Sequence, residues 1–172
     1  MKKIVLKYGI ISCLIVVGVP VIFMGIMGNG PESFDLGAIV GYTSMIVAMA
    51  LVYFAMRHFR DNQNEGIMTF FQGMQIGLLI SAMGGVAWGI YNLVFVKFIM
   101  PDFYEQYYAH QSGQSIGSPE FEQGFAQMMD QMGFWYTDFG GTLLMFLTVF
   151  LIGLVVSLIS SLILQRREVV AA

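Results

Sequence analysis

Four apolar runs, none with a charged residue in its interior, dominate this sequence. They cover approximately residues 8–27, 37–56, 69–96 and 142–164. The hydrocarbon core of a bilayer needs about 20 apolar residues of helix to cross it, so each run is long enough. We therefore predict an all-α fold: a four-helix transmembrane bundle that forms a single integral-membrane domain over residues 1–172.

The composition agrees with a chain whose solvent is lipid. Hydrophobic residues make up 57% of the sequence and charged residues 11%, which is about half the charged share of an ordinary globular protein. There is no basic patch of the kind that nucleic-acid binding requires, so we expect no nucleic-acid partner. Cys13 is the single cysteine, which excludes an internal disulfide and a cysteine-built metal site.

The segments between the runs sort their charges by sign. Seven of the eight basic residues flank one side: Lys2, Lys3, Lys7, Arg57, Arg60, Arg166 and Arg167. The exception is Lys97, at the end of the third run. Segments 28–36 and 100–139 carry acidic residues and neither Lys nor Arg. The positive-inside rule then predicts that both termini are cytoplasmic and that these two acidic segments lie outside.

The segment 100–139 is the only sizeable part that we expect outside the bilayer. Its pattern predicts two short helices around a Gly/Ser-rich linker at 111–118, and Ser118 with Pro119 suits the start of the second helix. Apolar residues recur there at steps of three and four: Phe121, Phe125, Met128, Met132 and Trp135. We predict a short amphipathic helical segment between the third and fourth membrane helices, packed on protein or at the lipid interface.

Two kinds of metal chemistry are conceivable in this segment. The first set has soft ligands that suit Cu(I): Met128, Met129, Met132 and His110. The second set offers ligands for a divalent cation or an acid–base pair: Asp102, Glu105, His110, Glu120 and Glu122. Met also fills apolar helix faces, and no catalytic motif accompanies either set. We therefore favour a solvated acidic surface and predict no catalytic residue, no cofactor and no metal site.

Small residues form a regular stripe along the third run. They recur at every fourth position: Gly73, Gly77, Ser81, Gly85 and Gly89. Such spacing lets two helix backbones approach closely in lipid, which predicts a helix-packing face. A weaker stripe, consisting of Gly153, Ser157 and Ser161, lies on the fourth run. We favour packing within the bundle over a homodimer seam, and both remain open.

Polar residues within the spans are few. Thr69 and Gln72 match a capping box at the start of the third helix. We interpret Gln75 and Asn92 first as amides that hydrogen-bond a neighbouring helix and second as pore-lining groups. No Asp, Glu, Lys, Arg or His lies in the middle of a run. Coupled carriers often use such a group, so a complete coupled transporter is disfavoured.

Several short motifs resemble a known family. They are Leu6-Lys7-Tyr8-Gly9, Gly41-Tyr42, Arg60-Asp61, the glycine-rich third run, Pro101-Asp102-Phe103, and the stretch 153–164 that ends near Arg166-Arg167. Over nearly its whole length the chain resembles the bacterial membrane family called domain of unknown function 4199. The resemblance implies a small four-span protein of Bacteroidetes-type bacteria without an established biochemical role. It brings no catalytic or binding residues.

These observations lead to two functional hypotheses for a protein of the bacterial cytoplasmic (inner) membrane. The first is a non-enzymatic accessory or interaction subunit that works through helix packing and an external acidic surface. Its partners would be the lipid bilayer and either a second protein or further copies of itself. The alternative is an oligomeric pore or facilitator for a small solute, with Gln75 and Asn92 along its path.

Overall fold

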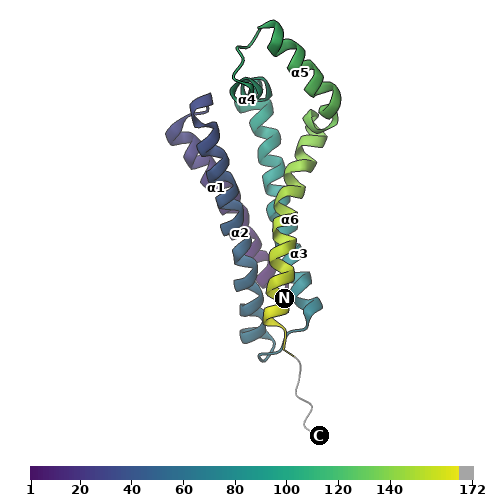
Figure 1. Cartoon of the computed structure of the whole chain (residues 1–172). Helices are drawn as coiled ribbons and strands as arrows, with labels where there is room; N and C mark the ends of the chain where they lie inside the picture. Colours follow the sequence, from purple (N-terminus) through teal and green to yellow (C-terminus); the bar gives the residue numbers. More distant parts are fainter. Residues whose placement is uncertain (167–172) are drawn as a thin grey trace.

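The fold is all-helical, as predicted. The computed structural model describes residues 1–166, and Figure 1 shows four long helices with two shorter ones across one end of the bundle. Arg167, which contributes to the predicted distribution of basic residues, lies outside the described part of the chain. The long helices are α1 (Lys2–Met27), α2 (Phe34–Gln63), α3 (Phe70–Val94) and α6 (Asp138–Leu164). All four are long and apolar enough to cross a membrane.

The helices extend beyond the apolar runs because their ends are stabilised by capping and polar residues. α6 begins at Asp138, four residues before the run at 142, because the Thr137 hydroxyl accepts a hydrogen bond from the Gly140 N–H at 3.0 Å. α2 continues through Arg57 and Arg60 to Gln63. The capping box predicted for α3 is confirmed, since Thr69 and Gln72 exchange both of its hydrogen bonds.

The segment between α3 and α6 forms two short helices, as predicted. α3 ends in one turn of π-helix, η2 (Phe95–Ile99), which is followed by α4 (Phe103–Ser112) and α5 (Pro119–Met132). A 3-10 turn, η3 (Gly133–Tyr136), leads into α6, and a similar turn, η1 (Pro31–Ser33), precedes α2. The Ser118 hydroxyl caps α5 by accepting from the Phe121 N–H, and Pro119 occupies the first turn.

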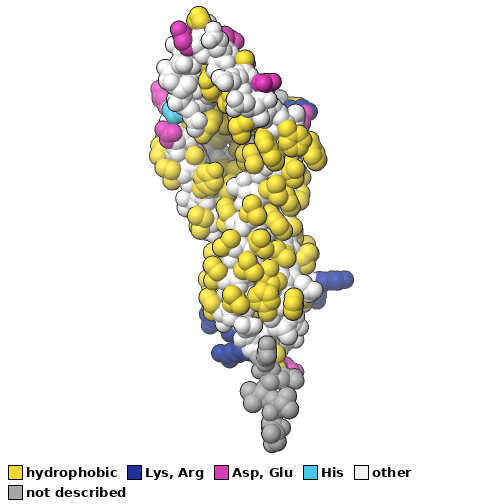
Figure 2. Space-filling model, turned by 45° about the vertical axis from the view of Figure 1, so that its right-hand side comes forward, with side chains coloured by type: hydrophobic (Ala, Val, Ile, Leu, Met, Phe, Trp, Pro, Cys, Tyr) yellow, Lys and Arg dark blue, Asp and Glu magenta, His cyan; other side chains and the backbone are white. Residues whose placement is uncertain are grey.

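We call the end covered by α4 and α5 the capped end, and the opposite end, which carries most Lys and Arg, the basic end. Figure 2 shows Asp and Glu mostly at the capped end, Lys and Arg mostly at the basic end, and hydrophobic side chains between them. α3 and α6 form the most extensive helix pair, and α1 contacts both α2 and α3. In Figure 1 the α1–α2 pair and the α3–α6 pair diverge toward the capped end.

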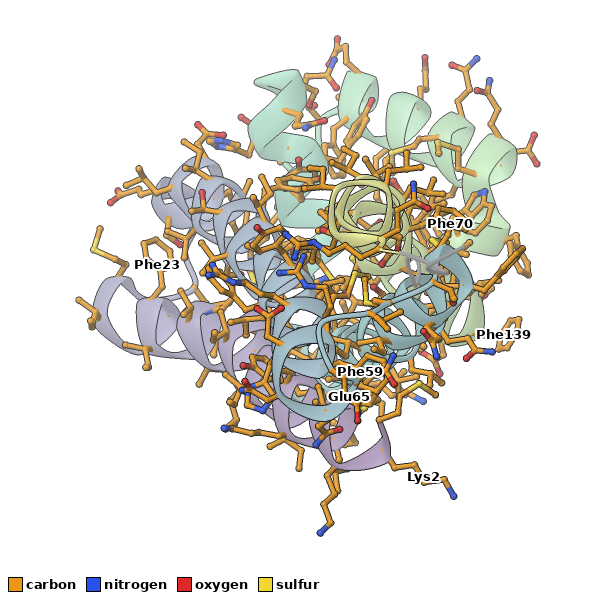
Figure 3. The ribbon with its side chains drawn as sticks, turned by 90° about the horizontal axis from the view of Figure 1, so that it is seen from below. Lys2, Phe23, Phe59, Glu65, Phe70 and Phe139 are labelled. Carbon is orange, nitrogen blue, oxygen red and sulfur yellow. The ribbon has the colours of Figure 1, made fainter. Side chains whose placement is uncertain are left out.

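The basic end is densely packed. Its core consists of buried side chains from all four long helices, and Val52, Met56, Ile76 and Ile80 are fully buried there. Seen from this end in Figure 3, Phe59 lies toward the middle of the bundle and Lys2 points outward. A short antiparallel bridge closes this end, because Met68 and Arg166 exchange two backbone hydrogen bonds of 3.1 and 2.9 Å.

Candidate functional site

A cavity of about 560 Å³ occupies the capped half of the bundle. It lies where the two helix pairs diverge, and α4, α5 and η3 cover it from above. Figure 2 shows the surface hollowed in this half of the molecule. All four long helices contribute lining residues, so the site depends on the assembled bundle rather than on one element. A volume of this size suits a small organic ligand.

Aromatic rings make up much of the wall. They come from α1, α2, α3, η2, α4 and η3: Phe23, Phe34, Tyr42, Trp88, Tyr91, Phe95, Phe103, Tyr104, Tyr107, Tyr108, Trp135 and Tyr136. Many of them contact one another, as in the stacked pair Trp88–Tyr91, whose ring centroids are 5.1 Å apart. Tyr104 meets Tyr136 edge-on at 4.7 Å. Aromatic side chains that pack on one another in this way form a rigid wall. Because these side chains cannot rotate into the cavity, the space between the helices stays open.

Flexible thioethers and small residues complete the lining. Met24, Met45, Met128, Met132 and Met145 face the cavity. Met is unbranched and adapts to irregular shapes, so this part of the wall can adjust to a ligand. On α2, Gly37 and Gly41 also line it, and a methyl group on Gly41 would meet no atom within 4 Å. The α2 side of the cavity therefore has unfilled space.

The apolar face of α5 rests on protein. Phe121 is only 2% exposed and packs on Phe125 and Tyr108 at ring distances of 5.6 and 5.4 Å. Met128 and Met132, farther along this face, line the cavity. The amphipathic helix predicted between the third and fourth spans therefore forms, together with α4, a lid over the cavity.

One aromatic residue of α2 ties the lid to the bundle. Phe34 is 9% exposed and packs against three rings of α4. The ring distances are 5.6 Å to Phe103, 5.8 Å to Tyr107 and 5.6 Å to His110. The His110 Nε2 also lies 3.3 Å from the Asp35 carboxylate. These contacts connect α2 to α4 at the capped end of the bundle.

A few uncharged polar groups converge where α3, α4 and α6 meet. A methyl group on Gly141 would lie 3.2 Å from the Tyr104 hydroxyl and 3.5 Å from Asn92 Nδ2. Burial raises the pKa of Tyr104, while a hydrogen bond with Asn92 acts in the opposite direction. Within the described residues, the indole N–H of Trp88 is buried and has no hydrogen-bond acceptor. Donors and acceptors are thus present on a mostly apolar wall.

None of the described residues that line the cavity carries a charged side chain. The nearby ion pair Lys97–Asp138, at 2.5 Å, consists of side chains that are 50% and 57% exposed. Removing an ion from water into such a site costs several kcal/mol unless a counter-charge is present. The lining therefore selects against charged ligands.

The predicted small-residue stripe of α3 lies against α6. Its five members, Gly73, Gly77, Ser81, Gly85 and Gly89, are buried. A methyl group on Gly73 would lie 2.6 Å from the Ser161 hydroxyl, and one on Gly89 would lie 2.9 Å from the Thr142 carbonyl oxygen. The stripe on α6 faces it in antiparallel order, with Ser157 against Gly77 and Gly153 against Ser81.

The contacts of the stripe leave no room for larger side chains. The hydroxyls of Ser81 and Ser157 donate to the carbonyls of Gly77 and Gly153 in their own helices, at 2.7 and 2.6 Å, and so are satisfied locally. These contacts lie within one chain. That the stripe holds the helices together stays a prediction, and substitutions at Gly77 test it.

The two span amides lie in different places. Asn92 lines the cavity, whereas Gln75 is exposed on the outside of α3 near the basic end. In the described structure, the cavity does not continue into the basic end, because the densely packed core fills the bundle there. One copy of the chain therefore does not join Gln75 and Asn92 along a single path.

The acidic residues weighed as cation ligands do not gather. Asp102, Glu105, Glu120 and Glu122 are all exposed, and Asp102 accepts a hydrogen bond from Gln106. Over residues 1–166, no group of three or more His, Cys, Asp or Glu side chains is arranged to hold a metal ion. Of the residues weighed for Cu(I), Met128 accepts a hydrogen bond from the Tyr136 hydroxyl, and His110 faces Asp35.

The sequence analysis did not identify the cavity. Its lining comes from all six α-helices and from the short turns between them, and no local pattern reveals which faces of them meet. Two signals were available, namely the many Tyr and Trp residues between 88 and 136, and the two glycines, 37 and 41, one turn apart at the start of the second span. Both acquire meaning only once the helices are arranged in space.

The chain belongs to the family described as "Protein of unknown function (DUF4199)", whose model matches residues 7–166. The family predicted from short motifs is thereby confirmed. No curated protein matches the sequence, and no solved structure matches it either.

Proposed function

We propose that this protein is a non-enzymatic membrane component that binds a small, uncharged, mostly apolar molecule in the cavity at its capped end. The observation that carries the proposal is the cavity itself, about 560 Å³ of space with aromatic and thioether walls and without a charged lining residue in the described chain. Burial of apolar ligand surface supplies the driving force, and a few polar groups give orientation. The chemistry of the wall favours binding over catalysis.

The proposed location is a bacterial inner membrane, with both termini in the cytoplasm. The four long apolar helices support a membrane location, and the excess of Lys and Arg at the basic end supports this orientation. Single cysteines at Ser115 and Asn62, in a Cys13→Ala background, test the orientation. A membrane-impermeant maleimide applied to intact cells should label position 115 and spare position 62, and the reverse pattern would invert the topology.

An accessory role extends this proposal. The lid carries exposed carboxylates on α4 and α5, including Glu105, Glu120 and Glu122. A partner protein with a basic surface would be attracted to them, chiefly through a faster rate of encounter. A ligand bound in the cavity beneath the lid would then also influence this partner-binding surface. Crosslinking in the native membrane, followed by identification of the attached protein, tests this role.

The oligomeric pore is a second candidate, which one observation restricts. Gln75 faces outward, so a path that includes it would have to run between copies of the chain rather than through one. Because Asn92 is an uncharged polar residue of the cavity lining, this path would favour an uncharged solute. A stable homo-oligomer with solute flux in liposomes would support this candidate, and a monomer without flux would refute it.

Native mass spectrometry tests the binding proposal. The protein is released from its membrane in mild detergent, and its mass is compared with those of Gly41→Phe and Gly25→Phe. Neither glycine has an atom within 4 Å of an added methyl group, but only Gly41 lines the cavity. We expect a bound small molecule on the wild type and on Gly25→Phe, and its loss from Gly41→Phe. A wild type without any bound mass, or the same bound mass on all three, would refute the proposal.

A further inference from the structure

The cavity is less closed between α2 and α6 than between α1 and α3. Three of its lining residues on α2 and α6 are also exposed, namely Ala38, Tyr42 and Leu144. The exposed fraction is 57% for Tyr42 and 38% for Leu144. On the opposite side the lining residues of α1 and α3, such as Phe23 and Trp88, are at most half-exposed. Among the gaps between the long helices, the one between α2 and α6 is therefore the most open, and we call it the opening of the cavity.

This opening lies at the depth of lipid chains. At a rise of 1.5 Å per residue, Tyr42 is about 12 Å from the first residue of α2, and Leu144 is about 9 Å from the start of α6. A helix as long as α6 spans about 40 Å, so it extends about 5 Å beyond a 30 Å hydrocarbon core on each side. The opening then faces acyl chains, about 4 to 7 Å below the boundary of the hydrocarbon.

The surface around the opening agrees with this depth. Outward-facing residues of α2 and α6 near it are apolar, with exposed fractions of 62% for Ile39, 59% for Ile46 and 54% for Leu151. Exposed apolar side chains of this density are stable against lipid tails and costly against water. A molecule that passes between α2 and α6 therefore comes from the bilayer.

The polar groups of the cavity lie nearer the lid than this lipid-facing rim does, since Gly141 precedes the rim residue Leu144 by nearly one turn of α6. Asn92 and Tyr104 meet under the lid near Gly141, whereas the α2 side offers Gly41 and Met45. An occupant that matches both regions has a hydrogen-bonding head under the lid and a hydrocarbon tail toward the opening. Because no described lining residue is charged, a phosphate or ammonium head would lose its hydration without compensation.

We infer that the ligand is an uncharged amphiphile of the leaflet at the capped end, which enters sideways between α2 and α6. This inference rests on the proposed binding function and adds the class of ligand and its route. The uncharged head occupies the region of Asn92 and Tyr104, and the tail passes the glycine face of α2 into the lipid.

Tryptophan fluorescence offers a direct test, because the chain has only two Trp residues and both line the cavity. In the Trp135→Phe variant, Trp88 is the single reporter. The protein is placed in nanodiscs that contain either a monoacylglycerol or a lysophosphatidylglycerol, each with one acyl chain brominated at the same position. Bromine quenches an indole that it contacts, so the experiment compares an uncharged with an anionic head at equal tail chemistry.

We expect the monoacylglycerol to quench Trp88 by about twofold more than the lysophosphatidylglycerol, since only the former occupies the cavity. Gly41→Phe and Ala38→Phe, which fill the cavity and narrow its opening, should remove this excess. Gly25→Phe is the matched control and should retain it. Ala38 is exposed, so its substitution keeps the test valid even if Gly41→Phe folds poorly. Equal quenching by the two lipids, or an excess that survives both variants, would overturn the inference.

The two proposals fail in different ways. If the native protein carries a bound molecule that Gly41→Phe loses, but both brominated lipids quench equally, the binding function stands and the ligand class and route are wrong. If the native protein carries no bound molecule and the lipids quench equally, both proposals are wrong.

Discussion

The two ends of this bundle use the same four helices but pack them differently. At the basic end, small residues lie where α3 and α6 are in close contact, and buried Met, Ile and Val side chains fill the core. At the capped end, aromatic residues and a lid surround about 560 Å³ of space. Close packing stabilises helix association in lipid, where burial from water contributes little. The comparison shows that the basic end can hold the bundle together while the capped end remains open for a ligand.

The test with the largest expected effect replaces one glycine at each end of the bundle by a larger residue. Gly77→Leu at the α3–α6 contact would collide with Ser157 and Met56 and should destabilise the fold by about 3 kcal/mol. Gly41→Leu enters open space and should leave stability unchanged or raise it by up to about 1 kcal/mol, since Leu favours a helix. Thermal unfolding in detergent micelles measures both. Equal destabilisation by the two substitutions would contradict the contrast.

Removing bulk should give the next largest difference. Ile80, which is 0% exposed in the basic-end core, should lose about 2 kcal/mol of stability on substitution by Ala. Met145 lines the cavity and already borders empty space. Its substitution by Ala should therefore cost less than about 1 kcal/mol, because few packed neighbours are lost. Chemical unfolding in mixed micelles compares the two variants, and a larger loss for Met145→Ala would be evidence against an open capped end.

A smaller effect is expected where the lid meets α2. Phe34→Ala removes three ring contacts with α4 and should weaken the attachment of the lid by about 1 to 2 kcal/mol. The basic end should remain folded, so protease cleavage in the linker 113–118 should accelerate while the thermal midpoint changes little. Phe71→Ala is the matched control, because Phe71 is 77% exposed. Similar cleavage rates for both variants would show that Phe34 does not hold the lid.

The mildest perturbation is alkaline pH, which titrates two phenols in and beside the lid. Burial raises the pKa of Tyr104 and of Tyr136 above the ordinary value of a tyrosine. A phenol whose pKa is raised on folding contributes stability below its unfolded pKa and loses it as the pH rises through the folded pKa. Lid stability should therefore decrease above about pH 10. Ultraviolet titration of Tyr104→Phe against the wild type should show the loss of one late-titrating phenol, and identical titration curves would contradict this prediction.

The spans and the lid were predictable because each depends on local sequence. An uncharged run of sufficient length can satisfy its backbone hydrogen bonds in lipid as a helix wherever it lies, and caps such as Thr69 and Ser118 act within four residues. α2 and α6 begin before the apolar runs at 37 and 142, because charged residues at helix ends are compatible with a helix that extends beyond the hydrocarbon. Asp138 at the start of α6 is one example.

The cavity was not predictable because it depends on side chains that meet from distant parts of the sequence. Phe34 and Phe103, or Tyr104 and Tyr136, come together only when the lid folds back over the bundle. The glycine stripe of α3 was visible in the sequence, but its antiparallel match with Gly153, Ser157 and Ser161 required the relative height of the two helices. The pattern within a helix thus predicts a packing face, and the tertiary structure determines its partner.

A crystal structure grown from a lipidic mesophase would test the central claim most directly. Our account predicts that α2 and α6 stay apart beside Gly41, with elongated non-protein density running from Asn92 toward the lipid. It would be contradicted by α2 and α6 in close contact along their whole length, with Tyr42 and Met145 filling the space between them.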